Sequence, residues 1–196
     1  MWTLPNILTG LRLLTVPVLG WVLLTAGDAE SGRIVALALF VAASLTDVAD
    51  GWIARRRGQC SEFGALMDPI ADKALVATAL VCLSLLQLVP WWVTIVVLAR
   101  EVIVTGVRLT VLHHGVIPAS RGGKVKTATQ TALVVLALAA PQQTDLLTVA
   151  AVMAVLWTVV TGFDYGAKAA ALARPEALRA RPVASASDRR PVDSRP

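Results

Sequence analysis

Six apolar segments, separated by short charged or Pro- and Gly-containing breaks, dominate the sequence. They cover approximately residues 6–26, 33–55, 63–88, 91–112, 127–140 and 146–167. Most of them approach the roughly 20 residues that a helix needs to cross a bilayer. With 56% hydrophobic and only 16% charged residues, the chain is too apolar for a soluble domain of its length. We therefore predict an all-α polytopic membrane protein, with six transmembrane helices in one bundle and the fifth helix the shortest.

The basic residues indicate the orientation, because Lys and Arg in short loops stay on the cytoplasmic side. Two breaks are basic, with Arg55, Arg56 and Arg57 in one and Arg121, Lys124 and Lys126 in the other, whereas the opposite breaks hold Asp28, Glu30 and Asp145. We expect a multi-pass protein of the cell membrane, with both termini and the basic breaks in the cytoplasm. The net charge of +5 then reflects topology and attraction to lipid headgroups, and no nucleic-acid partner is expected.

The chain divides by composition at about residue 170. Residues 1–170 hold all the apolar segments and are predicted to form one transmembrane domain. Residues 171–196 mix Pro, Ala, Ser and Arg without helical periodicity, which is typical of a disordered segment. We predict a disordered basic tail in the cytoplasm.

Four aspartates at the cytoplasmic ends of the second and third segments form the most unusual feature of the chain. They are Asp47, Asp50, Asp68 and Asp72. Each ionised side chain within a bilayer costs on the order of 3 kcal/mol or more, so such residues indicate a functional site. Helical spacing and antiparallel pairing of the two segments would bring the four carboxylates to one depth, where they repel unless a cation lies between them. Oxygen ligands favour Mg²⁺, Mn²⁺ or Ca²⁺, and four carboxylates can hold two such ions.

Residues beside the aspartates fit a phosphate-containing ligand. Gly51 and Gly64 allow either a close approach of that ligand to the backbone or tight packing of the helices. Arg55, about one turn after Asp50, carries a guanidinium suited to phosphate oxygens.

Together these residues form the pattern Asp-x2-Asp-Gly-x2-Ala-Arg-x8-Gly-x3-Asp-x3-Asp over residues 47–72, which resembles the signature of the CDP-alcohol phosphotransferase family. The resemblance implies a homodimeric membrane enzyme with six helices, which transfers a phosphatidyl or similar group from a CDP-linked donor to an alcohol and releases CMP. It implies that the four aspartates bind two divalent cations, Mg²⁺ or Mn²⁺, and that Asp72 is also the catalytic base. It further implies that Gly51, Arg55, Ser61 and Gly64 belong to the site of the nucleotide donor.

The alcohol acceptor is indicated by cations at the end of the fourth and the start of the fifth segment, namely Arg108, Arg121, Lys124 and Lys126. So many cations suit a phosphorylated acceptor. The stretches around them, and the opening 4–12 with Asn6 and Thr9, are more similar to the phosphatidylglycerophosphate synthase branch. That similarity implies CDP-diacylglycerol as donor, glycerol 3-phosphate as acceptor, and Asn6 and Thr9 at the nucleotide site, although both could instead cap a helix. By contrast, we interpret Arg100 and Glu101 mainly as a structural ion pair.

Three alternatives stay open at this point. A cardiolipin synthase of the same family would use phosphatidylglycerol as acceptor, and a phosphatidylinositol phosphate synthase would use inositol phosphate. A divalent cation transporter would also carry intramembrane carboxylates, but it would not explain the cations near the cytoplasmic side.

Overall fold

The structure, a computed structural model, describes residues 4–57, 62–111 and 121–172, and the side chains of residues 10–46, 70–107 and 122–170. Within these ranges the chain consists of helices joined by short turns and contains no strand. The helices are α1 (Leu4–Ala26), α2 (Glu30–Arg57), α3 (Glu62–Leu85), α4 (Trp91–Val111), α5 (Arg121–Ala139) and α6 (Thr144–Leu172). The prediction of an all-α chain with six helices is confirmed.

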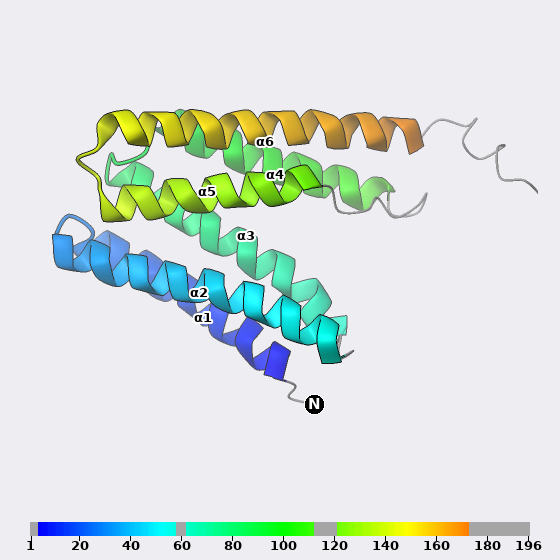
Figure 1. The fold of residues 1–196 in the computed structure, drawn as a ribbon, viewed down its shortest axis with the longest axis horizontal. Helices are drawn as coiled ribbons and strands as arrows, with labels where there is room; N and C mark the ends of the chain where they lie inside the picture. Colours follow the sequence, from blue (N-terminus) through cyan, green and yellow to red (C-terminus); the bar gives the residue numbers. More distant parts are fainter. Residues whose placement is uncertain (1–3, 58–61, 112–120, 173–196) are drawn as a thin grey trace, which may run out of the picture.

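The helices alternate in direction along one bundle axis (Figure 1). The turns between α1 and α2, α3 and α4, and α5 and α6 lie at one end of the bundle. The other end therefore holds the beginnings of α1, α3 and α5 and the final turns of α2, α4 and α6. The motif residues of α2 and α3 and the basic residues of α5 all lie toward this second end.

Helix α3 is central to the bundle and packs against α1, α2, α4 and α5. Its contact with α1 is close at Gly20, where an added Cβ would lie 3.2 Å from Cγ2 of Thr78. Small residues at helix crossings allow such an approach, which is how helices commonly pack in lipid. All six helices contribute to one buried apolar core, with members such as Leu19, Phe40, Leu80, Val97, Leu133 and Ala154.

The turn between α1 and α2 depends on two glycines. A Cβ on Gly32 would lie 1.9 Å from the carbonyl oxygen of Ala26, and one on Gly27 would lie 2.3 Å from that of Leu23. Either distance is far below a van der Waals contact, so only glycine fits at these two positions. Arg33 closes the turn by donating to the carbonyl of Asp28 at 2.9 Å.

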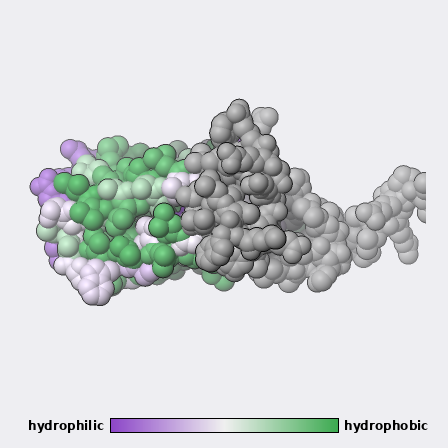
Figure 2. Space-filling view, turned by 90° about the horizontal axis from the view of Figure 1, so that it is seen from below, coloured by the Kyte–Doolittle hydropathy of each residue, from purple (hydrophilic) through white to green (hydrophobic). Residues whose placement is uncertain are grey.

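The outer surface of the bundle is apolar. Figure 2 shows hydrophobic residues over most of the described part of one face, with hydrophilic residues gathered at the end that carries the turns. Large apolar side chains that point outward include Leu14, Trp21, Val102 and Phe163, each more than 60% exposed. By length and composition, one helical segment among the residues searched, Thr144–Ala170, can cross a membrane, while the apolar segment Gly10–Ala26 is shorter. Six membrane crossings stay a prediction.

Helix α5 begins earlier in the sequence than predicted. The sequence interpretation placed Arg121, Lys124 and Lys126 in a loop before an apolar segment starting near residue 127, but α5 already begins at Arg121. Hydropathy detects the apolar part of a helix and not its hydrogen-bonded backbone, and long cationic side chains can extend from a helix end toward water. These residues therefore occupy the first two turns of α5, where the helix fixes their spacing. The predicted tail, beyond α6, lies outside the described residues.

Candidate active site

The aspartate motif lies on two consecutive helices. Asp47 and Asp50 belong to the last three turns of α2, and Asp68 and Asp72 to the first three turns of α3. The two helices are antiparallel neighbours (Figure 1). The backbone thus agrees with the predicted placement of the two pairs at one end of the bundle.

Most of the predicted ligands lie outside the part of the chain whose side chains are described. This applies to the side chains of Asn6, Thr9, Asp47, Asp50, Gly51, Arg55, Gly64, Asp68, Arg108 and Arg121, and to Ser61 altogether. Among the side chains that are described, no group of three or more His, Cys, Asp or Glu residues could hold a metal ion. Of the four aspartates, Asp72 belongs to that described set.

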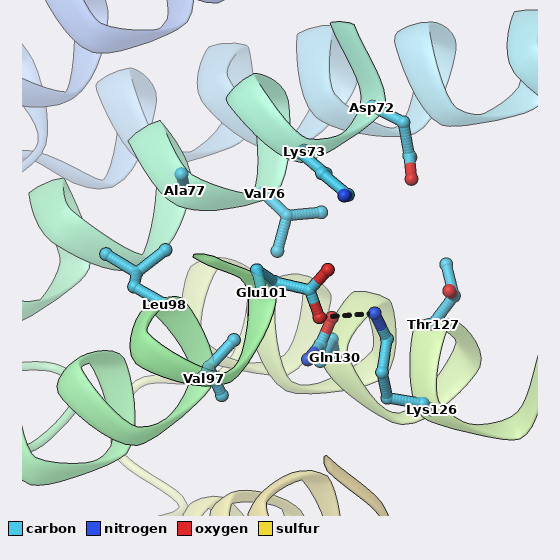
Figure 3. Close-up of a pocket in the computed structure, with 10 residues that line it drawn as sticks. All are labelled: Asp72, Lys73, Val76, Ala77, Val97, Leu98, Glu101, Lys126, Thr127 and Gln130. Atoms are coloured by element: carbon cyan, nitrogen blue, oxygen red, sulfur yellow. Dashed lines mark hydrogen bonds and ion pairs between the residues drawn. The ribbon is translucent and has the colours of Figure 1, made fainter. Parts of the chain in front are cut away.

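Asp72 lines a small pocket between α3, α4 and α5 (Figure 3). The pocket has a volume of about 50 Å³, enough for a few water-sized groups. Its walls are Asp72, Lys73, Val76 and Ala77 from α3, Val97, Leu98 and Glu101 from α4, and Lys126, Thr127 and Gln130 from α5. Two carboxylates and two ammonium groups therefore face one confined space.

Lys126 is held at this pocket by an ion pair across two helices. Its Nζ donates to Oε1 of Glu101 at 2.6 Å, and the side chains of the two residues are 12% and 15% exposed. The same carboxylate oxygen accepts from Nη1 of Arg100 at 2.9 Å. Partly buried ion pairs are screened less by solvent and salt than exposed ones. Lys124, two residues earlier on α5, is exposed and is not among the residues that line the pocket.

Glu101 is in turn part of a polar connection between α4 and α6. Arg100 donates through Nη2 to Oγ1 of Thr161 at 3.1 Å. Its side chain passes Gly162, where an added Cβ would lie 3.4 Å from Cγ of Arg100. The predicted Arg100–Glu101 pair is confirmed, and Lys126 joins it from α5.

Lys73 is the second lysine of the pocket. Its Nζ donates to Oγ1 of Thr105 at 2.5 Å, and the Thr105 hydroxyl donates to the carbonyl oxygen of Glu101 at 2.7 Å. Glu101 and Thr105 lie one turn apart, so one face of α4 contacts lysines from both α3 and α5.

The sequence interpretation left Lys73 unassigned and did not pair Glu101 with Lys126. The spacing of Glu101 and Thr105 on one helical face is a sequence signal for this arrangement. Which helices lie opposite that face follows only from the three-dimensional packing.

The chain is similar in sequence to known proteins over most of its length. Residues 2–163 match the CDP-alcohol phosphatidyltransferase family. A protein of Mycobacterium tuberculosis (strain ATCC 25618 / H37Rv), described as a probable phosphatidylglycerophosphate synthase, is 50% identical over 170 residues, covering 85% of this chain and 81% of the relative. A Bacillus subtilis (strain 168) protein described as CDP-diacylglycerol–glycerol-3-phosphate 3-phosphatidyltransferase is 37% identical over 185 residues. This match covers 86% of this chain and 95% of the relative.

A protein of Rickettsia typhi (strain ATCC VR-144 / Wilmington) with the same description is 36% identical over 172 residues, covering 84% of this chain and 96% of the relative. These matches extend over nearly the whole helical part of the chain, including the aspartate motif and the residues of the pocket. The chain therefore belongs to the CDP-alcohol phosphatidyltransferase family and is an enzyme of that type.

Proposed function

We propose that this enzyme transfers the phosphatidyl group of CDP-diacylglycerol to glycerol 3-phosphate, giving phosphatidylglycerophosphate and CMP. The observation that carries the proposal is the pocket that both Asp72 and Lys126 line. An acceptor that is both an alcohol and a phosphate needs a base at one end and a cation at the other. The names of the relatives reported above, which include CDP-diacylglycerol and glycerol 3-phosphate, support this choice of substrates.

The four aspartates form a donor set that suits hard divalent cations, because all their ligand atoms are oxygens. Their backbones lie on antiparallel neighbours, in the last turns of α2 and the first turns of α3, and we propose that together they hold two Mg²⁺ or Mn²⁺ ions. When bound, such ions neutralise the diphosphate and lower the barrier to its cleavage.

Each part of the chain then has a distinct task in the reaction. Asp72 would take the proton of the acceptor hydroxyl. The acceptor oxygen would then attack the phosphorus that carries the diacylglycerol group, and the bond from this phosphorus to CMP would break as CMP departs. Lys126 would bind the acceptor phosphate, with Arg108, Arg121 and Lys124 as further cations at the same end of the bundle. Asn6, Thr9, Gly51, Arg55, Ser61 and Gly64 would contact the nucleotide donor.

The apolar outer surface supports a place in the membrane. We propose six crossings, with both termini and the aspartate motif at the cytoplasmic side, because the basic residues gather at that end. CDP-diacylglycerol carries its diphosphate at the lipid–water interface, so the end of the bundle that holds Asp72 must face that interface. The homodimer and the basic cytoplasmic tail expected from the sequence complete this proposal.

The test is CMP release by purified protein in detergent with CDP-diacylglycerol and Mg²⁺ or Mn²⁺. We expect release only when an acceptor is added, with glycerol 3-phosphate preferred over phosphatidylglycerol and inositol phosphate. Preference for phosphatidylglycerol would instead identify a cardiolipin synthase. No CMP release with any of these alcohols would refute the proposal.

A further inference from the structure

A lysine binds a substrate phosphate more tightly when its side chain is already ordered before the substrate arrives. The Lys side chain has four methylene groups, and ordering it costs about 2 kcal/mol of rotamer freedom. Lys126 is already ordered, because its Nζ lies 2.6 Å from Oε1 of Glu101 at the wall of the pocket (Figure 3). The Glu101 carboxylate therefore sets where this ammonium group lies.

Glu101 is itself held by a second cation, Arg100. Arg100 contacts the same oxygen, Oε1, at 2.9 Å and reaches Thr161 of α6 at 3.1 Å. The carboxylate is thus anchored through α4 to α6 on one side and holds a lysine of α5 on the other. These contacts connect Glu101 to two other helices of the bundle, α5 and α6.

A purely structural ion pair between helices would not need to face the site. The Glu101–Lys126 pair does face it, since both side chains line the pocket that also holds Asp72. Without the Glu101 carboxylate, the positive charges of Lys126, Arg100 and Lys73 would lie in the same region, and the negative charge that now pairs with Lys126 and Arg100 would be missing. The Lys126 ammonium would then turn toward other anions, of which Asp72 lines the same pocket.

We infer that Glu101 is a positioning residue for the acceptor: its carboxylate holds the Lys126 ammonium at the pocket wall, ready for a phosphate and apart from Asp72. This inference rests on the proposed function, in which Lys126 binds the acceptor phosphate. It assigns Glu101 no contact with substrate and no part in the chemical step. Its effect therefore appears in acceptor affinity before it appears in turnover.

The first test separates affinity from turnover in the full-length enzyme. We expect Glu101→Gln to raise KM for glycerol 3-phosphate about tenfold, which corresponds to about 1.4 kcal/mol. KM for CDP-diacylglycerol should stay unchanged, and kcat at saturating glycerol 3-phosphate should change by less than about threefold. Glu101→Asp should recover part of the affinity, because it restores the charge on a shorter side chain. An unchanged or lowered KM for glycerol 3-phosphate in Glu101→Gln would overturn the inference.

Two controls show whether Glu101 acts through Lys126. Asp164→Asn removes a carboxylate from another lysine pair, Asp164 with Lys168 at 2.6 Å, but at an exposed position. It should leave both KM values unchanged. Glu101→Gln combined with Lys126→Gln should be no worse than Lys126→Gln alone, since the anchor has nothing left to position. Additive losses in the double variant would contradict the inference.

A second measurement does not depend on turnover. Acylation of lysines by an amine-reactive reagent, read by mass spectrometry, reports how accessible the side-chain nitrogen of each lysine is to the reagent, and an ion pair such as that of Lys126 with Glu101 shields this nitrogen. We expect Glu101→Gln to raise the labelling of Lys126 relative to Lys168, and an unchanged ratio would overturn the inference. If the wild-type protein does not use glycerol 3-phosphate but this ratio rises, the proposed acceptor fails while the hold of Glu101 on Lys126 stands.

Discussion

Replacing Asp72 by Asn tests the role of this residue most sharply, because the change keeps the shape of the side chain and removes its charge. In the present pocket, the formal charges of Asp72, Glu101, Lys73 and Lys126 cancel. Asp72→Asn therefore leaves one net positive charge around the space where the acceptor would bind. Affinity for an anionic acceptor should be retained or increased.

The rate should change in the opposite direction. A general base typically accelerates a reaction about 10²- to 10⁴-fold, and the variant also loses a proposed metal ligand. We therefore expect kcat to fall by about a thousandfold or more, while KM for glycerol 3-phosphate does not rise. Steady-state CMP release over a range of glycerol 3-phosphate concentrations gives both constants.

Asp145→Asn is the matched control, because it removes an exposed aspartate in the first turn of α6 and lies at the opposite end of the bundle. It should behave like the wild-type enzyme. If Asp72→Asn keeps more than about a tenth of the wild-type kcat, Asp72 is not the base. The thermal stability of Asp72→Asn should match that of the wild-type enzyme, so that the fall in kcat reports on the reaction and not on the fold.

Two further predictions concern the stability of the bundle. Thr94→Val removes the hydrogen bond between the hydroxyl groups of Ser84 and Thr94, which lie 2.7 Å apart with both residues at most 1% exposed. It should cost about 1–2 kcal/mol, and adding Ser84→Ala should recover part of this loss because no buried hydroxyl is then left unpaired. Gly32→Ala should destabilise the turn between α1 and α2, because the new Cβ would meet the Ala26 carbonyl. Gly166→Ala on α6, where nothing lies within 4 Å of the new Cβ, should be neutral or stabilise by about 0.5–1 kcal/mol. Thermal unfolding in detergent measures all four variants, and equal effects of the two glycine substitutions would contradict the packing described for the turn.

Much of the fold was predictable because apolar segments and charged breaks follow directly from the physics of helices. The starts or ends of several helices were predicted to within a few residues, for example the end of α1 at Ala26 and the start of α4 at Trp91. The start of α5 was predicted six residues too late, since its first turns carry Arg121, Lys124 and Lys126 rather than apolar side chains. Hydropathy contains no information on backbone hydrogen bonds in such a polar turn.

The candidate site also has a part that the sequence predicts and a part that it does not. The aspartate motif is local in sequence, so its spacing alone predicted four carboxylates on two adjacent helices. The partner of Glu101 was not predictable by spacing, because Lys126 follows it by 25 residues on a helix whose rotation depends on packing. The link from Lys73 to Thr105 spans 32 residues and arises in the same way.

The most direct test of the proposed reaction is the transfer of isotopically labelled glycerol 3-phosphate into lipid. Purified enzyme in detergent would receive the labelled acceptor, CDP-diacylglycerol and Mg²⁺ or Mn²⁺, and mass spectrometry would identify the lipid product. We predict labelled phosphatidylglycerophosphate in a one-to-one ratio with released CMP. Release of CMP without label in the lipid, or labelled lipid formed equally well by Asp72→Asn, would contradict the account.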